Sequence, residues 1–84
     1  MGTKINPGKY DCYGNALPDE PLFILLARDP SAPTLLRLWA TNRRREISNG
    51  NRPTSDWAMT NEAHATANEM EKWRSLNNGV WRKG

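Results

Sequence analysis

Hydrophobic side chains recur at steps of three and four residues along two long stretches, residues 31–48 and 55–76. This spacing places them on one face of an α-helix. Between the stretches, Gly50 suits a helix C-terminus and Pro53 prevents a helix from continuing. Because a short connection makes neighbouring helices antiparallel, the pattern predicts a helical hairpin. The stripe positions expected in its core are Leu35, Leu36, Leu38, Trp39, Ile47, Met59, Ala63, Thr66, Ala67, Met70, and Trp73 or Arg74.

A denser apolar run, Leu22–Ala27, precedes the hairpin. Asp19 can cap a helix N-terminus, and Pro21 is favoured in a first helical turn. The residue before Pro30 is pushed out of the helical region, so an element should end there. These signals predict a short helix over residues 19–28. A buried strand is the alternative, because periodicity does not distinguish a short apolar run in a strand from one in a helix.

The two ends of the chain lack such periodicity. Residues 1–18 are interrupted by glycines and prolines, so we expect an irregular N-terminal arm. The arm holds Tyr10 and Tyr13, and disordered leaders are poor in aromatic residues, so we expect it to pack on something. Residues 77–84 form the tail. The fold class expected is all-α: a single domain over residues 1–84, with a short N-terminal helix followed by an antiparallel helical hairpin.

The small size of the chain calls for a partner. A chain of 84 residues buries roughly 60–65% of its unfolded surface, which gives a marginal core. Small domains are commonly reinforced by disulfides, by metals or by oligomerisation. Cys12 and His64 are the only cysteine and the only histidine, so neither an intramolecular disulfide nor a Cys/His zinc site can form. We therefore expect a homo-oligomer and no metal ion.

The formal net charge of +3 lies in the second half of the chain. Charges balance over residues 1–42, whereas residues 43–84 carry eight basic and five acidic side chains. This bias suits an anionic partner. The longest apolar run is far shorter than a membrane span, and no apolar run opens the chain. Together with the single cysteine, these features predict a cytoplasmic location and no membrane association.

No set of residues predicts catalysis. The six glycines are scattered, so a phosphate-cradling loop is not expected. His64 falls in the middle of a predicted helix with no carboxylate placed to orient it, so a nucleophilic pair with Cys12 or a serine is not expected. Glu62, Glu69 and Glu71 share a helix with basic residues, which is typical of surface charges. We expect a protein that is not an enzyme and has no cofactor.

The residues best suited to hold a ligand are arginines and tyrosines. Arg43–Arg45 could grip phosphate in a bidentate manner, although a solvated helix face is the plainer interpretation, since consecutive residues spread around a helix. The tyrosines could stack on a base or simply pack the arm. Arg28 either pairs with Asp29 or lies with Thr34 beside an anion at a helix start. The predicted ligand-binding residues are Tyr10, Tyr13, Arg28, Thr34, Arg37 and Arg43.

In residues 10–16, 19–40 and 70–74, this chain resembles a group of short proteins encoded by bacteriophages and prophages. The resemblance lies in Tyr10–Asp11–Cys12–Tyr13, in the proline-punctuated Asp19–Ala40 block and in Met70–Glu71–Lys72–Trp73–Arg74. The layout is also similar to the anti-CBASS and anti-Thoeris sponges of phages. Those small helical-hairpin proteins oligomerise and sequester the cyclic nucleotide signals of host defence. The similarity implies a binder without turnover, with its ligand between protomers, phosphates on arginines and bases on aromatics.

The hypothesis from the sequence is a phage anti-defence protein that sequesters a host cyclic nucleotide immune signal in the cytoplasm of the bacterial host. Two alternatives stay open. One is a small basic nucleic-acid-binding phage accessory protein that uses Arg43–Arg45, Arg52 and the tail. The other is a protein–protein inhibitor of a host factor, or a structural adaptor, with tryptophans as anchors. Trp57 and Trp81 are the candidates, since tryptophan is enriched at interfaces.

Overall fold

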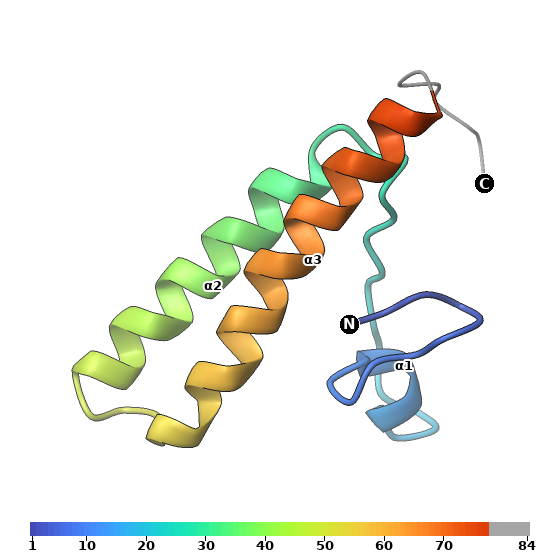
Figure 1. Ribbon diagram of the computed structural model, residues 1–84. Coiled ribbons are helices and arrows are strands. Elements are labelled where there is room, and N and C mark those ends of the chain that lie inside the picture. Colours follow the sequence, from blue (N-terminus) through green and yellow to red (C-terminus); the bar gives the residue numbers. More distant parts are fainter. Residues whose placement is uncertain (78–84) are drawn as a thin grey trace.

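The computed structural model describes residues 1–77, and these residues form helices and connecting segments without a strand. Two long helices, α2 (Ala32–Ser48) and α3 (Trp57–Leu76), pack side by side (Figure 1). A single turn of helix, α1 (Cys12–Asn15), precedes them, and a short 3₁₀ turn, η1 (Thr54–Asp56), leads into α3. The helical fold class and the packing of two long helices are confirmed. Of the predicted tail, residues 78–84 lie outside the described residues.

Local chemistry fixes both ends of α2. Ser31 occupies the N-cap position, and its own N–H donates to the Asp29 Oδ1 at 2.9 Å. At the other end, Gly50 has φ of 79°, its N–H donates to the Ile47 carbonyl, and the Asn51 N–H donates to the Glu46 carbonyl. This pair of bonds is a Schellman motif, whose left-handed position favours glycine. The predicted role of Gly50 at the helix end is confirmed.

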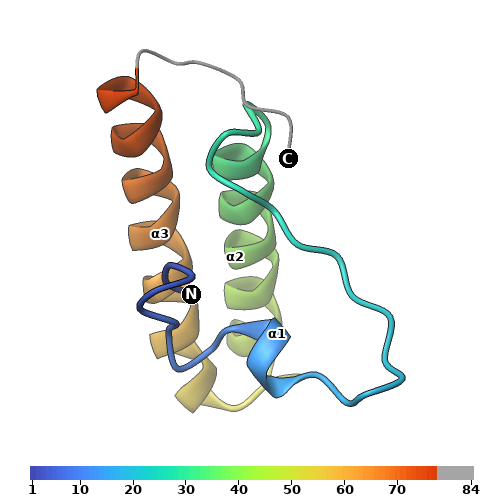
Figure 2. The same cartoon turned by 90° about the vertical axis from the view of Figure 1, so that its right-hand side faces the viewer.

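Small residues bring α2 and α3 close together. Ala32, Ala40, Ala63, Ala67 and Thr60 have no exposed surface. Hydrogen bonds across the pair run from the start of α2 to the end of α3, and from the end of α2 to the start of α3. The two helices therefore run in opposite directions (Figures 1 and 2). The predicted burial of Ala63 and Ala67 is confirmed.

The predicted core assignments of Leu35, Leu38 and Trp73 are wrong. These side chains are 45%, 56% and 39% exposed. Successive helical residues are rotated by about 100°, so Leu35 and Leu38 lie on the side of α2 opposite buried Ala40. A stripe as broad as Leu35–Trp39 covers too much of the helix circumference to face a single neighbour. About half of each of these two leucines therefore stays exposed.

The predicted helix over residues 19–28 is not present. Residues 20–26 have no regular secondary structure, and residues 27–30 form turns. The Glu20 N–H donates to the Leu17 carbonyl and a Glu20 carboxylate oxygen accepts from the Leu17 N–H, so a turn replaces the expected cap at Asp19. The remaining run is too short to repay the cost of helix nucleation in water. The alternative, a buried strand, is wrong too, because no strand exists in the described residues.

The N-terminal arm, predicted to be irregular over residues 1–18, contains one helical turn, α1. There the Asn15 Nδ2 donates to the Asp11 carbonyl at 2.8 Å, which closes one helical turn. The arm reaches α3 through the Met1 amino group, which forms ion pairs with Asp11 at 2.7 Å and with Glu62 of α3. Figure 2 shows the arm lying across α3 while the chain after α1 bows outward before it enters α2.

Among residues 1–77, no helix combines the length and the apolar character that crossing a membrane requires.

Candidate functional site

Arg37 is engaged with α3. Its guanidinium donates to the Asn68 Oδ1 at 2.8 Å and forms an ion pair with Glu71. The hydrogen bond from Arg37 lowers the pKa of the Glu71 carboxyl, and the same bond raises the pKa of Arg37. The sequence predicts that Arg37 binds an external anion. In the structure its partner is instead a carboxylate of the same chain.

Arg43 likewise has partners within the chain. Its guanidinium lies 3.4 Å from an Asp56 carboxylate oxygen and 4.0 Å from a Glu46 carboxylate oxygen. Its guanidinium carbon also sits 5.0 Å from the centre of the Trp39 ring, a cation–π distance. The side chain therefore ties the end of α2 to the start of α3.

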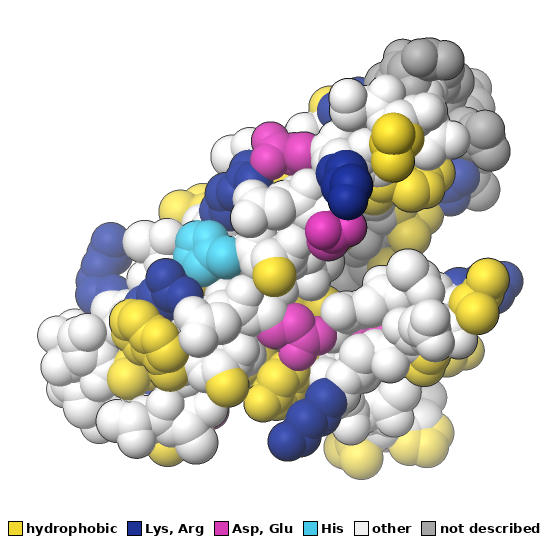
Figure 3. All heavy atoms as spheres, in the orientation of Figure 1, with side chains coloured by type: hydrophobic (Ala, Val, Ile, Leu, Met, Phe, Trp, Pro, Cys, Tyr) yellow, Lys and Arg dark blue, Asp and Glu magenta, His cyan; other side chains and the backbone are white. Residues whose placement is uncertain are grey.

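Arg44 forms the other half of this junction. Its Nε donates to the Thr60 Oγ1 at 2.8 Å, and its guanidinium lies 4.5 Å from the centre of the Trp57 ring. The Thr60 hydroxyl in turn donates to the Trp57 carbonyl at 2.7 Å. Of the three consecutive arginines, two thus bind the helix pair together, and Arg45 is exposed. On the face shown in Figure 3, basic and acidic side chains alternate instead of forming a continuous basic patch.

The start of α2 offers little to an anion. The Ala32 N–H donates to the Asp29 carbonyl, the Leu35 N–H donates to the Ser31 carbonyl, and Pro33 has no N–H. The Thr34 amide is the one donor of the first turn left without a backbone acceptor in the described residues. Arg28, which is half-buried, forms no ion pair with Asp29 there, so the predicted local pair is not present.

The two tyrosines flank the start of α1 in different surroundings. Tyr13 is 76% exposed. Tyr10 is half-buried, with the Lys9 ammonium 5.6 Å from the centre of its ring. The six predicted ligand-binding residues therefore fall into separate groups on the arm, at the α2 start and along the helix pair. Two hollows in the surface of residues 1–77, one beside α1 and one between the arm and α3, include none of the six.

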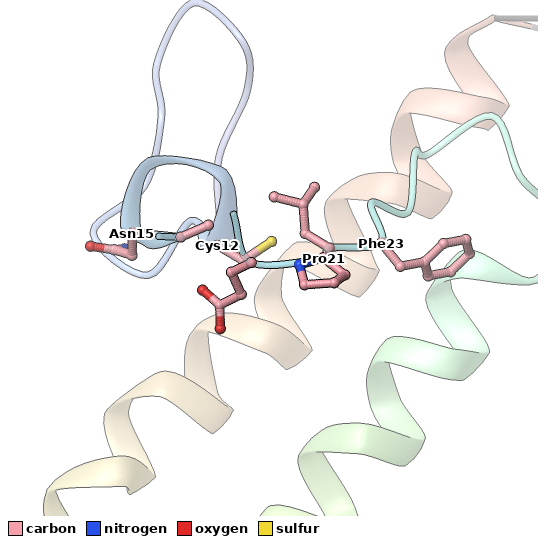
Figure 4. A pocket seen from close by; sticks show the side chains of 7 residues that line it. Cys12, Asn15, Pro21 and Phe23 are labelled. Atoms are coloured by element: carbon pink, nitrogen blue, oxygen red, sulfur yellow. The ribbon is translucent and has the colours of Figure 1, made fainter. Parts of the chain in front are cut away.

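One of these hollows lies between α1 and the chain that follows it. It has a volume of about 390 Å³ and opens widely to solvent. Figure 4 shows Cys12, Asn15 and Pro21 around it, with the Phe23 ring projecting away from α1. Its lining residues are Cys12, Asn15, Ala16, Glu20, Pro21, Leu22 and Phe23.

The more conspicuous feature is a continuous run of apolar residues at the surface, Leu22–Leu26, called here the apolar strip. Leu22, Phe23, Ile24 and Leu26 are 44%, 79%, 49% and 46% exposed. The helix predicted over residues 19–28 did not anticipate an exposed apolar surface at these residues. The sequence nevertheless gave a sign against a helix here. A run of apolar residues without a polar interruption leaves a surface helix with no polar face toward solvent.

No group of three or more histidine, cysteine, aspartate or glutamate residues in the described part of the chain is arranged to hold a metal ion. In comparisons with protein families, curated proteins and solved structures, nothing matches this chain.

Proposed function

We propose that this chain is a self-associating binding protein that sequesters its ligand without turnover. One observation carries the proposal: large apolar side chains are at the surface while the buried core holds only small ones. Among the described residues, twelve large hydrophobic side chains are at least 39% exposed, and the buried residues are four alanines, Pro33 and Thr60. A second surface that covers the apolar side chains would supply the burial that the helix pair lacks.

For the ligand, we propose a cyclic nucleotide of host defence, as the similarity to phage sponges implies. A stoichiometric sink would lower the free signal below the threshold of its effector. The candidates with no carboxylate partner in the described residues are Tyr10, Tyr13, Arg28 and Thr34. Arg37 and Arg43 would have to leave Glu71 and Asp56 to bind phosphate.

Thermal shift measurements test the ligand directly. Because ligand that binds only the folded state raises stability, a cyclic nucleotide at 100 times its Kd should add about 2.7 kcal/mol. In Tyr13→Ala the shift should shrink, since stacking on the exposed ring is lost, and Tyr13→Phe should retain it. If no cyclic dinucleotide, cyclic trinucleotide or ADP-ribose-type signal raises the melting temperature, the nucleotide proposal is refuted.

A second candidate function is inhibition of a host protein. The exposure of the apolar strip, of Trp57 (44%) and of Trp73 (39%) favours it, because aromatic anchors dominate protein–protein binding energy. If the protein inhibits a host protein, it should form a mixed complex with that protein, and cyclic nucleotides should not raise its melting temperature. Nucleic-acid binding has less support, since Arg43 and Arg52 already have carboxylate partners, Arg52 lying 2.8 Å from Glu46. A nucleic-acid binder would also lose affinity steeply with salt.

A further inference from the structure

Arg44 is held in place by its neighbours, but its charge is not neutralised. Its Nε donates to the Thr60 Oγ1 at 2.8 Å, and its Nη2 donates to the Asn61 Oδ1. Both acceptors are uncharged, and Arg44 forms no ion pair with any carboxylate among residues 1–77. The guanidinium also lies 4.5 Å from the centre of the Trp57 ring. These contacts orient the side chain and leave its positive charge without a counterion in the described residues.

The carboxylates near this end of the helix pair already have partners. Asp56 and Glu46 lie beside the guanidinium of Arg43. Glu62, the residue after Asn61 in α3, pairs with the N-terminal amino group. A rotation of one nearby carboxylate toward Arg44 would therefore break an existing ion pair. An external anion is the counterion that Arg44 can acquire without such a loss.

The guanidinium of Arg44 keeps the donors that a phosphate requires. An arginine side chain has five N–H groups in one plane. Thr60 and Asn61 accept from Nε and Nη2, so Nη1 keeps both of its N–H groups and Nη2 keeps one. The edge that joins Nη1 and Nη2 can therefore donate to two oxygens of one phosphate, which is the bidentate arrangement that suits arginine. Because the side chain is already oriented, binding costs less side-chain entropy than it does for a mobile arginine.

Trp57 and His64 extend the site along α3. Trp57 is 44% exposed, so part of its ring is accessible to a nucleotide base. His64 is half-buried and follows Thr60 by four residues and Asn61 by three, which places it one turn further on the same side of the helix. Its imidazole can donate a hydrogen bond to a phosphate oxygen. In Figure 3, histidine (cyan) and basic side chains (dark blue) gather toward one end of the helix pair.

We propose that Arg44 binds a phosphate group of a nucleotide through its Nη1–Nη2 edge, with the base against the Trp57 ring. The inference rests on the nucleotide binding proposed above and specifies where the phosphate is held. The sequence pointed to Arg43 within the run of three arginines. The structure separates the two residues, because Arg43 has carboxylate partners and Arg44 has neutral ones.

An NMR titration of the full chain with AMP and with adenosine tests the site, since the two probes differ only in the phosphate. AMP should move the Nε–H signal of Arg44 and the indole N–H signal of Trp57, whereas adenosine should leave the Arg44 signal in place. Arg44→Gln should weaken AMP binding, followed at Trp57, by about 10- to 100-fold, because the charged donors are lost. Arg45→Gln is the matched control, since it removes the same charge from an exposed neighbouring position.

The wild-type titration decides the question even if circular dichroism shows that Arg44→Gln does not fold. If AMP moves neither signal, or if adenosine moves the Arg44 signal as far as AMP does, the inference is overturned. Equal AMP affinity in Arg44→Gln and the wild type would overturn it too, as would an equal loss in Arg45→Gln. In each of these cases, a cyclic nucleotide that still raises the melting temperature of the wild type leaves the sequestration proposal standing. Without that rise, both proposals fail.

Discussion

A substitution at Ala63 tests how closely α2 and α3 pack. Ala63 has no exposed surface, and Ala40 of α2 is also fully buried. The distance between packed helices depends on the side chains at the contact, so alanines permit a close approach. Ala63→Leu adds three carbon atoms at a fully buried position. The helices must either move apart or force the new side chain out of a favoured rotamer.

The expected cost follows from general packing energetics. Overpacking of a well-packed core costs about 1–3 kcal/mol. For a domain of 60–100 residues, each kcal/mol lowers the melting temperature by about 4–8 °C. Ala63→Leu should therefore melt roughly 5–20 °C below the wild type. The assay is thermal unfolding followed by circular dichroism at one fixed protein concentration, because a self-associating chain has a concentration-dependent Tm.

Ala58→Leu is the matched control, since Ala58 lies on the same helix and is exposed. Both alanine and leucine are strong helix formers, so this substitution should change Tm little. If Ala63→Leu melts at or above the temperature of Ala58→Leu, the helices are not held together by close contact of small residues.

Three further predictions concern the arm, the α2 end and pH. In Gly8→Ala the new Cβ would clash with the Met1 nitrogen, the group that pairs with Glu62, and would lie 2.7 Å from the Glu62 Oε1. The arm should therefore leave α3, and residues 1–11 should become sensitive to limited proteolysis. Gly14→Ala, with no atom within 4 Å of the new Cβ, should behave as the wild type. Gly50→Ala should cost about 1–2 kcal/mol of stability in urea unfolding, because the left-handed conformation is strained for alanine; an unchanged midpoint would contradict the cap. The Glu71 carboxyl should titrate below its ordinary pKa of 4.5 in NMR, and Arg37→Met should return the pKa to that value. Because the pKa of Glu71 is lower in the folded state, the ion pair stabilises the fold at pH values above the unfolded pKa, and this stabilisation is lost as the pH falls through the folded pKa. A Glu71 pKa that does not move in Arg37→Met would exclude the coupling between the two side chains.

The long helices could be predicted because their signals are local. Proline in the first turn, Gly50 at the end, and apolar steps of three and four all act within a few residues, and they located α2 and α3 within two positions of the observed bounds. Burial was harder to predict. The stripe of α2 contained both the buried Ala40 face and the exposed Leu35 and Leu38, and periodicity does not identify which part of a broad stripe meets the neighbour.

The strip and the site depend on residues outside their own segments, so local patterns predict them less well. Helix signals around Asp19 and Pro21 were outweighed by a turn that Glu20 closes on Leu17. Arg37 and Arg43 have the chemistry of anion binders, yet their partners Glu71 and Asp56 come from another element and could be found only after the helices were paired. The role of the exposed Tyr13 in ligand binding stays a prediction.

The proposed self-association is tested most directly by the mass of the protein in solution. Light scattering coupled to size-exclusion chromatography, over a range of protein concentrations, should give at least twice the chain mass of 9.6 kDa at the upper end of the range. A mass that stays at 9.6 kDa at every concentration would contradict self-association.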